Sequence, residues 1–267
     1  MEIGTRAAVE TDYAAFVRLF GELGIPDPVP RVDSFVVRLV PHMLVAHAGD
    51  DVVGYITWRA YGATVHVPNV AVDPAWRGRR IGELLLERVR GLAKAAGCTR
   101  WYLNVKATNT PALRLYERCG FALDKESWAL SIPWRAALAL PYDPGLAKAL
   151  VRPEEDAAIA ARFGLELERI AVLRSREGSI LVAVHAPDGG GPVAFSAFSP
   201  AYPGAYPFLT LRPDLAGALL RACHAHADLA RFDYIRLTVE GDRALHDTLV
   251  AGGAELTFAL YQLASAL

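Results

Sequence analysis

Cysteine is scarce in this chain of 267 residues, and neither sign of charge is in excess. The three cysteines are Cys98, Cys119 and Cys223; they form no Cys-x-x-Cys pair, and their odd number argues against a disulfide framework. We therefore expect a reducing, cytoplasmic setting. A net charge of −1 argues against a protein that binds nucleic acid through bulk positive charge.

Long apolar runs and clustered metal ligands are also missing from the sequence. No uninterrupted run of about 18 apolar residues occurs, so we expect no membrane span. The first ten residues, MEIGTRAAVE, contain acidic residues and no apolar stretch, unlike a signal peptide. His224 and His226 are two positions apart and would not face one ligand from a helix, so we expect no metal site.

The residues that are present predict a mixed α/β arrangement. Hydrophobic residues make up 53% of the chain, enough for a large core, and its length favours two domains. Periodicity and turn residues predict, in the first half, helices at 7–23 and 32–40, a hairpin at 43–61, a strand at 64–72, a helix from 81, a strand at 100–105, a helix at 111–119 and a strand at 127–133. Pro68 lies inside the strand at 64–72 and predicts a bulge there.

The second half matches the first in outline, which indicates a duplication. LVAHAGDDVVGYITW matches LVAVHAPDGGGPVAFSAF, WYLNVKATNTPALRLYERCGF matches YIRLTVEGDRALHDTLVAGGA, and RAAVETDYAA weakly matches VRPEEDAAIAA, in the same order. The alternative is that any two α/β domains share such composition. We predict a first domain at 1–135, a linker at 136–150 and a second domain at 151–267.

The segment DPAWRGRRIGELLLERV, residues 73–89, places three arginines and two glycines at the start of a helix. A strand, a glycine-containing turn and a helix present free backbone N–H groups, which together with the helix dipole attract phosphate. Arg77, Arg79 and Arg80 add donors suited to a diphosphate. The alternative is a solvated basic helix start, but arginine at that end opposes the dipole and is a poor choice for stability alone.

A second segment, NTPALRLYERCGF at 109–121, has clear helix boundaries. Thr110 is the expected N-cap, Pro111 the first helical residue, and Gly120 the residue just past the end. Tyr116 falls on the apolar face of this helix, so its position alone favours a core tyrosine.

Together the two segments resemble the GNAT N-acetyltransferase superfamily. The family's cofactor loop reads Arg/Gln-x-x-Gly-x-Gly/Ala; Arg77 and Gly82 fill its outer positions, and Arg80 replaces the middle glycine. The second segment contains every residue of the pattern Asn-x-x-Ala-x-x-Leu-Tyr-x-x-x-Gly-Phe. The resemblance covers about residues 1–132, and the second half matches only in outline.

The resemblance implies two tandem GNAT-like domains, each a mixed, mostly antiparallel sheet flanked by helices. It implies transfer of an acetyl group from acetyl-CoA to a primary amine by direct attack on the thioester. The pantetheine arm would lie in a split between the strand ending at Val72 and the strand at 100–105. The implied cofactor-binding residues are Val70, Ala71, Val72, Arg77, Gly78, Arg79, Arg80, Ile81, Gly82 and Asn109, with backbone N–H groups near Val70 and Ala71 as oxyanion donors.

For catalysis, the resemblance places the family's general acid at Tyr116. A phenol suits this role, because its pKa of about 10 keeps it protonated at neutral pH. His66 is the candidate base, since it alternates in phase with Val70 and Val72, unless Pro68 shifts that phase. A water chain to a more distant carboxylate is the alternative base.

The second half lacks both the loop and the acid, so we expect one cofactor per chain. Pro74 and Leu84 are ten positions apart, whereas the matching Pro213 and Leu219 are six apart. Aligning Ala244 with Ala112 places Gly241 opposite Asn109 and Thr248 opposite Tyr116. We expect a small-molecule or peptide amine as acceptor and a monomer or weak homodimer. A non-catalytic acyl-CoA-binding or regulatory protein is the alternative function.

Overall fold

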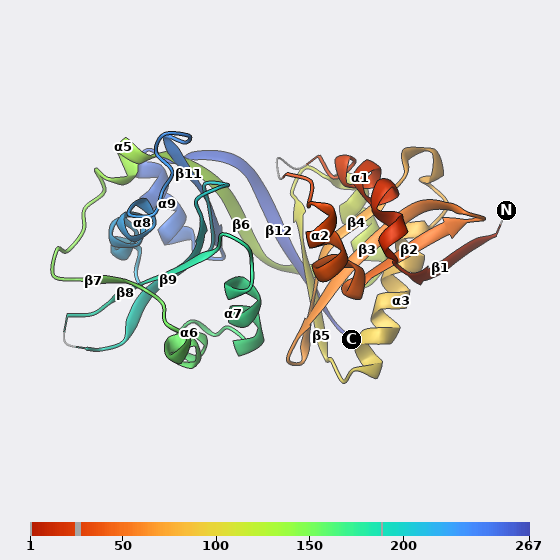
Figure 1. Ribbon diagram of the computed structural model, residues 1–267, viewed down its shortest axis with the longest axis horizontal. Coiled ribbons are helices and arrows are strands. Elements are labelled where there is room, and N and C mark those ends of the chain that lie inside the picture. The colour runs from red at the N-terminus through yellow and green to blue at the C-terminus, as the bar shows by residue number, and fades with distance from the viewer. Residues whose placement is uncertain (1, 25–27, 188) are drawn as a thin grey trace. The chain divides into compact units, whose positions relative to one another are not determined.

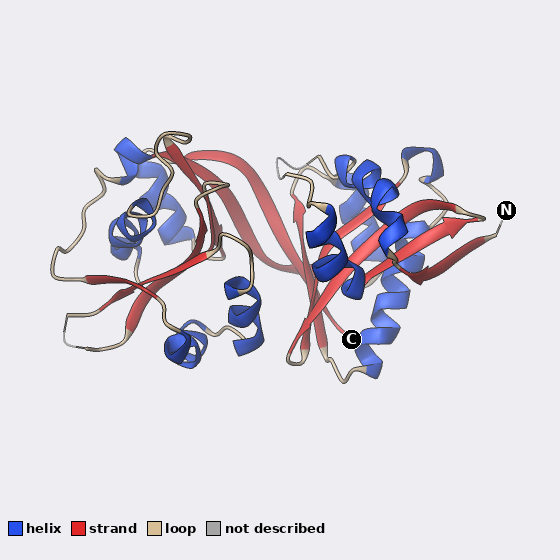
Figure 2. Cartoon of the chain, viewed as in Figure 1, coloured by secondary structure: helices blue, strands red, loops and turns tan. Residues whose placement is uncertain are grey.

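The computed structural model describes residues 2–24, 28–187 and 189–267. The chain divides into two compact units. Unit 1 comprises Met1–Val105, Asn109–Asp124 and Gln262–Leu267, and unit 2 comprises Lys106–Thr108 and Lys125–Tyr261. Each unit is an α/β fold with helices on both faces of a sheet (Figures 1 and 2).

The first repeat runs from β1 to β6. Its elements are β1 Ile3–Ala7, α1 Tyr13–Gly21, α2 Val32–Ser34, β2 Met43–Ala48, β3 Asp51–Tyr61, β4 Thr64–Val72, α3 Ile81–Ala95, β5 Arg100–Lys106, α4 Thr110–Arg118 and β6 Ala122–Pro133. The predicted hairpin is β2 and β3. The predicted helix at 7–23 is wrong in its first part, because β1 ends at Ala7 and a 3-10 turn at Glu10–Asp12 precedes α1.

After the short α5 (Trp134–Ala137), the second repeat runs from β7 to β12. Its elements are β7 Ala147–Leu150, α6 Asp156–Phe163, α7 Leu167–Arg174, β8 Ile180–His185, β9 Pro192–Ser199, β10 Gly204–Thr210, α8 Ala216–His224, β11 Tyr234–Glu240, α9 Arg243–Ala251 and β12 Glu255–Ala266. The order of strands and helices is the same as in the first repeat. The predicted pair of tandem domains with mixed, mostly antiparallel sheets is therefore confirmed.

Within unit 1 the strands follow the order β1-β2-β3-β4-β5-β12, and within unit 2 the order β6-β11-β10-β9-β8-β7. The pairs from β1 to β4 are antiparallel, and β4 pairs with β5 in parallel. In unit 2 the same pattern recurs, since β7 to β10 are antiparallel and β10 pairs with β11 in parallel.

The last strand of each repeat passes from one unit into the other. Most of β6 lies in unit 2, where Tyr234 to Glu240 pair with Pro133 to Ser127. The end of β12 lies in unit 1, where the Leu267 N–H donates to the Thr99 carbonyl at 2.9 Å. The boundaries of the compact units thus differ from those of the predicted domains 1–135 and 151–267. These domains are defined by the duplication, and they remain a prediction. The predicted linker at 136–150 contains the end of α5 and all of β7.

Alternation along the strands builds two apolar layers in each unit. On one face of unit 1, Tyr55 packs with Phe16 and Phe35 beneath α1. On the other face, a Cβ atom at Gly54 would lie 3.3 Å from Ile81 of α3, so α3 packs closely on β3. In unit 2, α6 and α7 cover one face with Ile159 and Ile170, and α8 and α9 cover the other.

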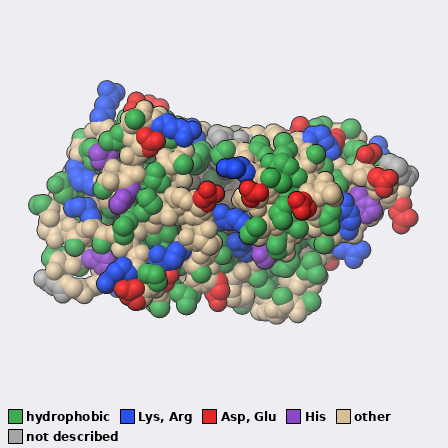
Figure 3. Space-filling model, in the orientation of Figure 1, with side chains coloured by type: hydrophobic (Ala, Val, Ile, Leu, Met, Phe, Trp, Pro, Cys, Tyr) green, Lys and Arg blue, Asp and Glu red, His purple; other side chains and the backbone are tan. Residues whose placement is uncertain are grey.

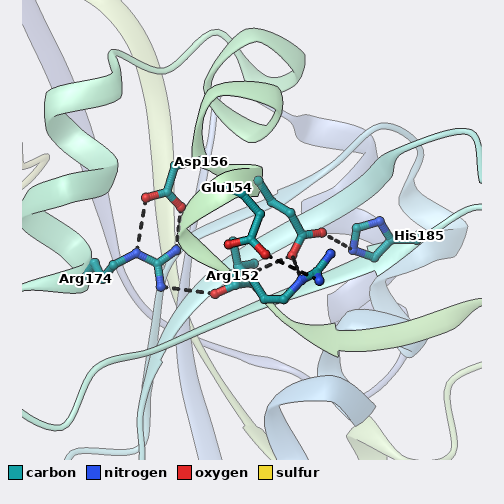
Figure 4. A network of polar contacts seen from close by, with 7 residues as sticks. Arg152, Glu154, Asp156, Arg174 and His185 are labelled. Atoms are coloured by element: carbon teal, nitrogen blue, oxygen red, sulfur yellow. Dashed lines mark hydrogen bonds and ion pairs between the residues drawn. The ribbon is translucent and has the colours of Figure 1, made fainter.

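A polar network fixes the start of α6 in unit 2 (Figure 4). The Arg174 guanidinium bonds both carboxylate oxygens of Asp156 and the carbonyl of Val151. The backbone N–H of Arg152 donates to Glu155 at 2.9 Å, and His185 lies 3.6 Å from the same carboxylate. In unit 1 the Val9 N–H donates to Asp12 in the same way, at 2.8 Å. In both repeats, therefore, a backbone N–H just before the first helical turn is bonded to a carboxylate three residues later.

Candidate active site

β4 and β5 of unit 1 pair at one end and part at the other. The pairing joins Thr64 to Arg100, Val65 to Trp101 and His66 to Tyr102. Beyond His66, β4 stays paired with β3 as far as Val72, and in the described part of the chain it makes no further pair with β5. The predicted split between these strands is present. It leaves a backbone edge of β4 open to an extended ligand.

A bulge lies on β4 at the closed end of this split, as Pro68 predicts. Thr57 of β3 pairs with Asn69, and Arg59 pairs with His66, so β4 carries one extra residue between the two pairs. The bulge reverses the alternation of β4. His66 therefore shares a face with Asn69 and Ala71, and the predicted phase with Val70 and Val72 is wrong.

His66 is the last residue of β4 that pairs with β5. Its ring stacks on that of Tyr102, with centroids 4.6 Å apart and planes 10° apart. The side chain is half-buried. His66 thus lies where the two strands separate, although not on the face that its sequence spacing indicated.

The loop that follows β4 leads into α3 and contains two residues in the left-handed conformation. A 3-10 turn at Pro74–Trp76, capped by the Asp73 carboxylate, is separated from α3 by Arg77 to Arg80. Gly78 has φ of 78°, and Arg80 has φ of 60°, the left-handed conformation that favours glycine. Arg80 therefore keeps the backbone of the glycine that it replaces in the family pattern, at a cost of about 1–2 kcal/mol. Strain of this kind occurs at ligand-binding sites.

The three arginines of the loop have different surroundings. The Arg77 guanidinium forms an ion pair with Glu22 at 2.9 Å, and its Nε donates to the Val72 carbonyl at 3.2 Å. The Arg79 guanidinium lies over the Trp76 ring, 4.6 Å from its centroid. Arg80 is exposed. Arg77 is thus attached to the end of α1 and to β4, whereas the other two lie at the surface beside the free N–H groups of α3.

Gly82 lies at the second position of α3 and allows close contact with α4. A Cβ atom there would lie 2.8 Å from Cδ2 of Leu115. Ile81 at the first position of α3 is buried. The start of α3 therefore packs closely against α4 at Leu115.

α4 begins one residue earlier than predicted. The Asn109 side chain accepts the N–H of Ala112 at 3.2 Å and is the N-cap, so the assignment of Thr110 as N-cap is wrong. An amide oxygen three residues before its donor satisfies a free N–H as well as a hydroxyl does. Asn109 itself is exposed at the start of the helix.

Tyr116 is buried, with 7% of its surface exposed, and its ring meets Phe121 edge-on at 5.9 Å. Burial, and secondarily the neighbouring Cys119, raise the pKa of Tyr116 well above its usual range. The phenol therefore keeps its proton at neutral pH, which is what a general acid requires.

The corresponding loop of unit 2 lacks four residues. A 3-10 turn at Pro213–Leu215 continues directly into α8 at Ala216. Gly217 at the second position of α8 lies against the carbonyl of Pro141. A cavity of about 400 Å³ beside it is lined by Leu140, Asp214 and Thr248, among others. An acidic residue and a carbonyl thus stand where unit 1 presents arginines.

The split between β10 and β11 is bridged by side chains. A bulge occurs here too, since Ala205 pairs with Phe198 and Phe208 with Ser196. The Tyr206 hydroxyl, from the bulge, donates to Glu240 of β11 at 2.6 Å, and Arg169 of α7 donates to the same hydroxyl at 3.1 Å. These bonds join the two strands beyond their last backbone pair, where no described side-chain bond joins β4 to β5 in unit 1.

α9 has no counterpart of the buried phenol. Asp242 accepts the N–H of Leu245 at 2.9 Å and corresponds to Asn109, so Gly241 is not its counterpart. The Ala254 N–H bonds the Leu249 carbonyl, as the Phe121 N–H bonds the Tyr116 carbonyl. Leu249 therefore stands at the position of Tyr116, and the alignment with Thr248 is wrong by one residue.

The fold and the split between β4 and β5 resemble those of GNAT acyltransferases, and comparison with known proteins supports this class. The model of the Acetyltransferase (GNAT) family matches residues 13–121, which lie in the first repeat. A mouse thialysine N-epsilon-acetyltransferase is 29% identical over 134 residues, which cover 44% of this chain and 78% of the mouse protein.

Solved structures resemble the whole chain in fold. A putative acetyltransferase from Pyrococcus horikoshii has a TM-score of 0.75 at 16% identity, with 99% of this chain and 89% of that chain covered. A tandem GNAT protein from the clavulanic acid biosynthesis pathway has a TM-score of 0.69 at 17% identity, with 99% and 98% covered. At these identities the likeness concerns the fold, and it includes the tandem arrangement.

Two kinds of feature are absent from the described residues. None of the helices in the described ranges combines the length and the apolar character needed to cross a membrane. In the same ranges, no group of three or more His, Cys, Asp or Glu side chains is placed to hold a metal ion. On the face drawn in Figure 3, basic and acidic side chains are interspersed, as the net charge of −1 suggests.

Proposed function

We propose that the first repeat transfers an acetyl group from acetyl-CoA to a primary amine, which attacks the thioester directly. The observation that carries this proposal is the open split above His66, which leads along β4 to the loop at 77–82. An extended pantetheine arm fits beside the free edge of β4, with its amides paired to the backbone of Val70 and Val72. The diphosphate then meets the first N–H groups of α3, at Ile81 and Gly82.

The arginines and Asn109 complete the cofactor site in this proposal. Arg79 and Arg80 lie at the surface of the loop and supply charge to the diphosphate, and Gly78 permits close approach of the backbone. Arg77 contributes through its backbone and by holding the loop against α1 and β4. Asn109 caps α4 and faces the cofactor from the start of that helix.

The reaction needs a base, an oxyanion site and an acid. We assign the oxyanion donors to backbone N–H groups near Val70 and Ala71, just beyond the bulge. Tyr116 gives its proton to the departing thiolate of coenzyme A. His66 accepts a proton from the amine, directly or through water, since it lies at the closed end of the split. The amine then forms a bond to the carbonyl carbon as the carbon–sulfur bond breaks.

The acceptor is a small-molecule or peptide amine. The mouse relative is named for acetylation of thialysine, which supports an amine acceptor, and the family model spans only the first repeat. We further propose a cytoplasmic monomer or weak homodimer, with residues 1–135 as the catalytic domain and 151–267 as a copy that binds no cofactor. The scarcity of cysteine supports the setting.

The test is release of free thiol from acetyl-CoA in the presence of primary amines. We expect amine-dependent release that is lost in the Tyr116→Phe variant. The competing function is a non-catalytic acyl-CoA-binding protein. Tight binding of acetyl-CoA without thiol release, across amino acids, polyamines and peptides, would establish that alternative in place of the enzyme.

A further inference from the structure

A polar strip lies on the α1 face of the sheet, next to the closed end of the split. Directly opposed residues of paired strands project from the same face of a sheet. Thr57 and Arg59 of β3 are opposed to Asn69 and His66 of β4, and His66 is opposed to Tyr102 of β5. These five side chains therefore share one face of the sheet. Tyr55, two residues before Thr57 on β3, lies on the same face and packs beneath α1.

Arg59 is a half-buried arginine of unit 1, and no carboxylate among the described residues lies within ion-pair distance of it. The paired arginines are Arg6, Arg18, Arg77, Arg90, Arg100 and Arg118, each within ion-pair distance of a carboxylate. Arg59 is half-buried, and its one described bond runs from the guanidinium to the Arg38 carbonyl at 3.0 Å. A half-buried cation without a counter-charge is costly and favours binding of an anion.

Two neighbours of Arg59 support the same reading. Thr57 is 3% exposed, and its hydroxyl has no hydrogen-bond partner within the described residues. A buried hydroxyl without a partner is unusual and is satisfied once a ligand reaches it. Burial, and then the charge of Arg59, lower the pKa of His42, so the positive field of Arg59 extends over this part of the unit.

We propose that Arg59 and the Thr57 hydroxyl bind an anionic group of the acceptor, which is therefore a small primary amine that also carries a carboxylate or a phosphate. Opposed residues have Cβ atoms about 4.5–5.5 Å apart, so an anion at Arg59 and an amine at His66 belong to a molecule with few bonds between them. The inference rests on the proposed acetyl transfer and names its substrate class.

The test compares probes of matched size. β-Alanine carries a carboxylate, 2-aminoethyl phosphate carries a phosphate, and propylamine carries neither. We expect kcat/KM for one of the two anionic probes to exceed that for propylamine at least tenfold. The preferred probe identifies the anion as a carboxylate or a phosphate.

Variants then assign this preference to the named residues. Arg59→Gln lowers kcat/KM for the anionic probe to the level of propylamine and leaves propylamine unchanged, and Arg59→Lys restores part of the difference. Thr57→Val raises KM for the anionic probe several-fold with little change in kcat. Arg88→Gln, at an exposed arginine of α3, leaves all three probes unchanged.

Two outcomes would overturn the inference while acetyl transfer stands. In one, propylamine is used as well as both anionic probes. In the other, Arg59→Gln lowers the rates of all three probes equally, which indicates a structural role. If no probe is acetylated, calorimetry with coenzyme A-saturated protein decides. Binding of an anionic probe that Arg59→Gln abolishes supports the anion site without the reaction, whereas no binding of either anionic probe refutes it.

Discussion

α4 and α9 begin and end alike, and they differ at the residue that we propose as the general acid. Each helix is capped by a side-chain oxygen that accepts an N–H three residues later, from Asn109 in one and Asp242 in the other. Each is followed, two residues after its end, by a glycine of positive φ, Gly120 at 87° and Gly253 at 95°. Between these matching ends, the buried phenol of Tyr116 is replaced by the buried Leu249. The second repeat has thus kept the packing of this helix but not the proposed acid.

The same contrast holds at the two parallel strand pairs. Both β4 and β10 carry a bulge near a proline, Pro68 and Pro207, and both pair with the next strand only at one end. In unit 1 no described pair joins β4 to β5 beyond His66, and in unit 2 the Tyr206–Glu240 hydrogen bond joins the two strands beyond their last pair. The separation of the two parallel strands is therefore a feature of the fold in both repeats. Whether a ligand can bind between them depends on the side chains that lie there, such as Tyr206 and Glu240 in unit 2.

The largest effect is expected from mutations in β6 and β12, the strands by which each repeat contributes to the other unit. Leu263 and Leu130 are both the ninth residue of their strands, and both are buried. Leu263→Ala should destabilise unit 1, and Leu130→Ala unit 2, each by about 2–5 kcal/mol, the usual cost of such a cavity. Hydrogen exchange should then show lost protection in β5 for the first variant and in β11 for the second. Loss confined to the repeat that carries the mutation would contradict the exchange.

Removing the hydroxyl that only one repeat possesses should slow the reaction. Tyr116→Phe is expected to lower kcat about 100-fold, with little change in acetyl-CoA affinity, because the lost proton donor acts on the leaving thiolate. Tyr61→Phe, at another buried tyrosine of unit 1, is the matched control. Turnover within a factor of two of the parent would make Tyr116 a core residue only.

The arginine loop, which the second repeat lacks, should account for coenzyme A binding. Arg77→Ala combined with Arg79→Ala should weaken affinity at least about tenfold, since a lost charge-assisted contact costs about 1–3 kcal/mol. Arg212→Ala, which removes a partner of Asp214 in unit 2, should change nothing. Calorimetry should give one site per chain; two equal sites, or an unchanged affinity in the double variant, would mean that unit 2 binds cofactor.

The smallest effect concerns the left-handed residue of the loop. Arg80→Gly should raise the free energy of unfolding by about 1 kcal/mol, because glycine adopts this conformation without steric cost. Arg79→Gly, at a neighbour without positive φ, should give no such gain. Denaturant titration of both variants is the measurement. Equal or lower stability of Arg80→Gly would show that the conformation of Arg80 costs nothing here.

The sequence predicted the architecture well because local signals and the repeated order agreed. Proline and glycine located the bulge at Pro68, the missing loop residues before α8 and the end of α4. The strand β1 was missed, since five residues of IGTRA carry no clear alternation and border a helical pattern. The sequence also did not predict that β6 and β12 each begin in one unit and continue in the other. The residues of a strand do not indicate which strands it pairs with.

The candidate site was predicted in part. The split and the buried Tyr116 lie where the family pattern indicated. The face of His66 was wrong, since one extra residue at the bulge reverses a period of two. The ion pair between Arg77 and Glu22 joins positions 55 residues apart, and the bridge between Tyr206 and Glu240 joins positions 34 apart. Spacing alone cannot predict such long-range partners.

The passage of β12 from unit 2 into unit 1 has a consequence for synthesis on the ribosome. β5, one arm of the split, receives its partner on the far side from residues 262–267, which follow all of unit 2 in the sequence. A growing chain that has emerged only as far as β6 therefore holds every proposed catalytic residue but lacks a strand of the unit that carries them. The second repeat must therefore be translated before the strand order of unit 1, and with it the proposed acetyl-CoA site, is complete.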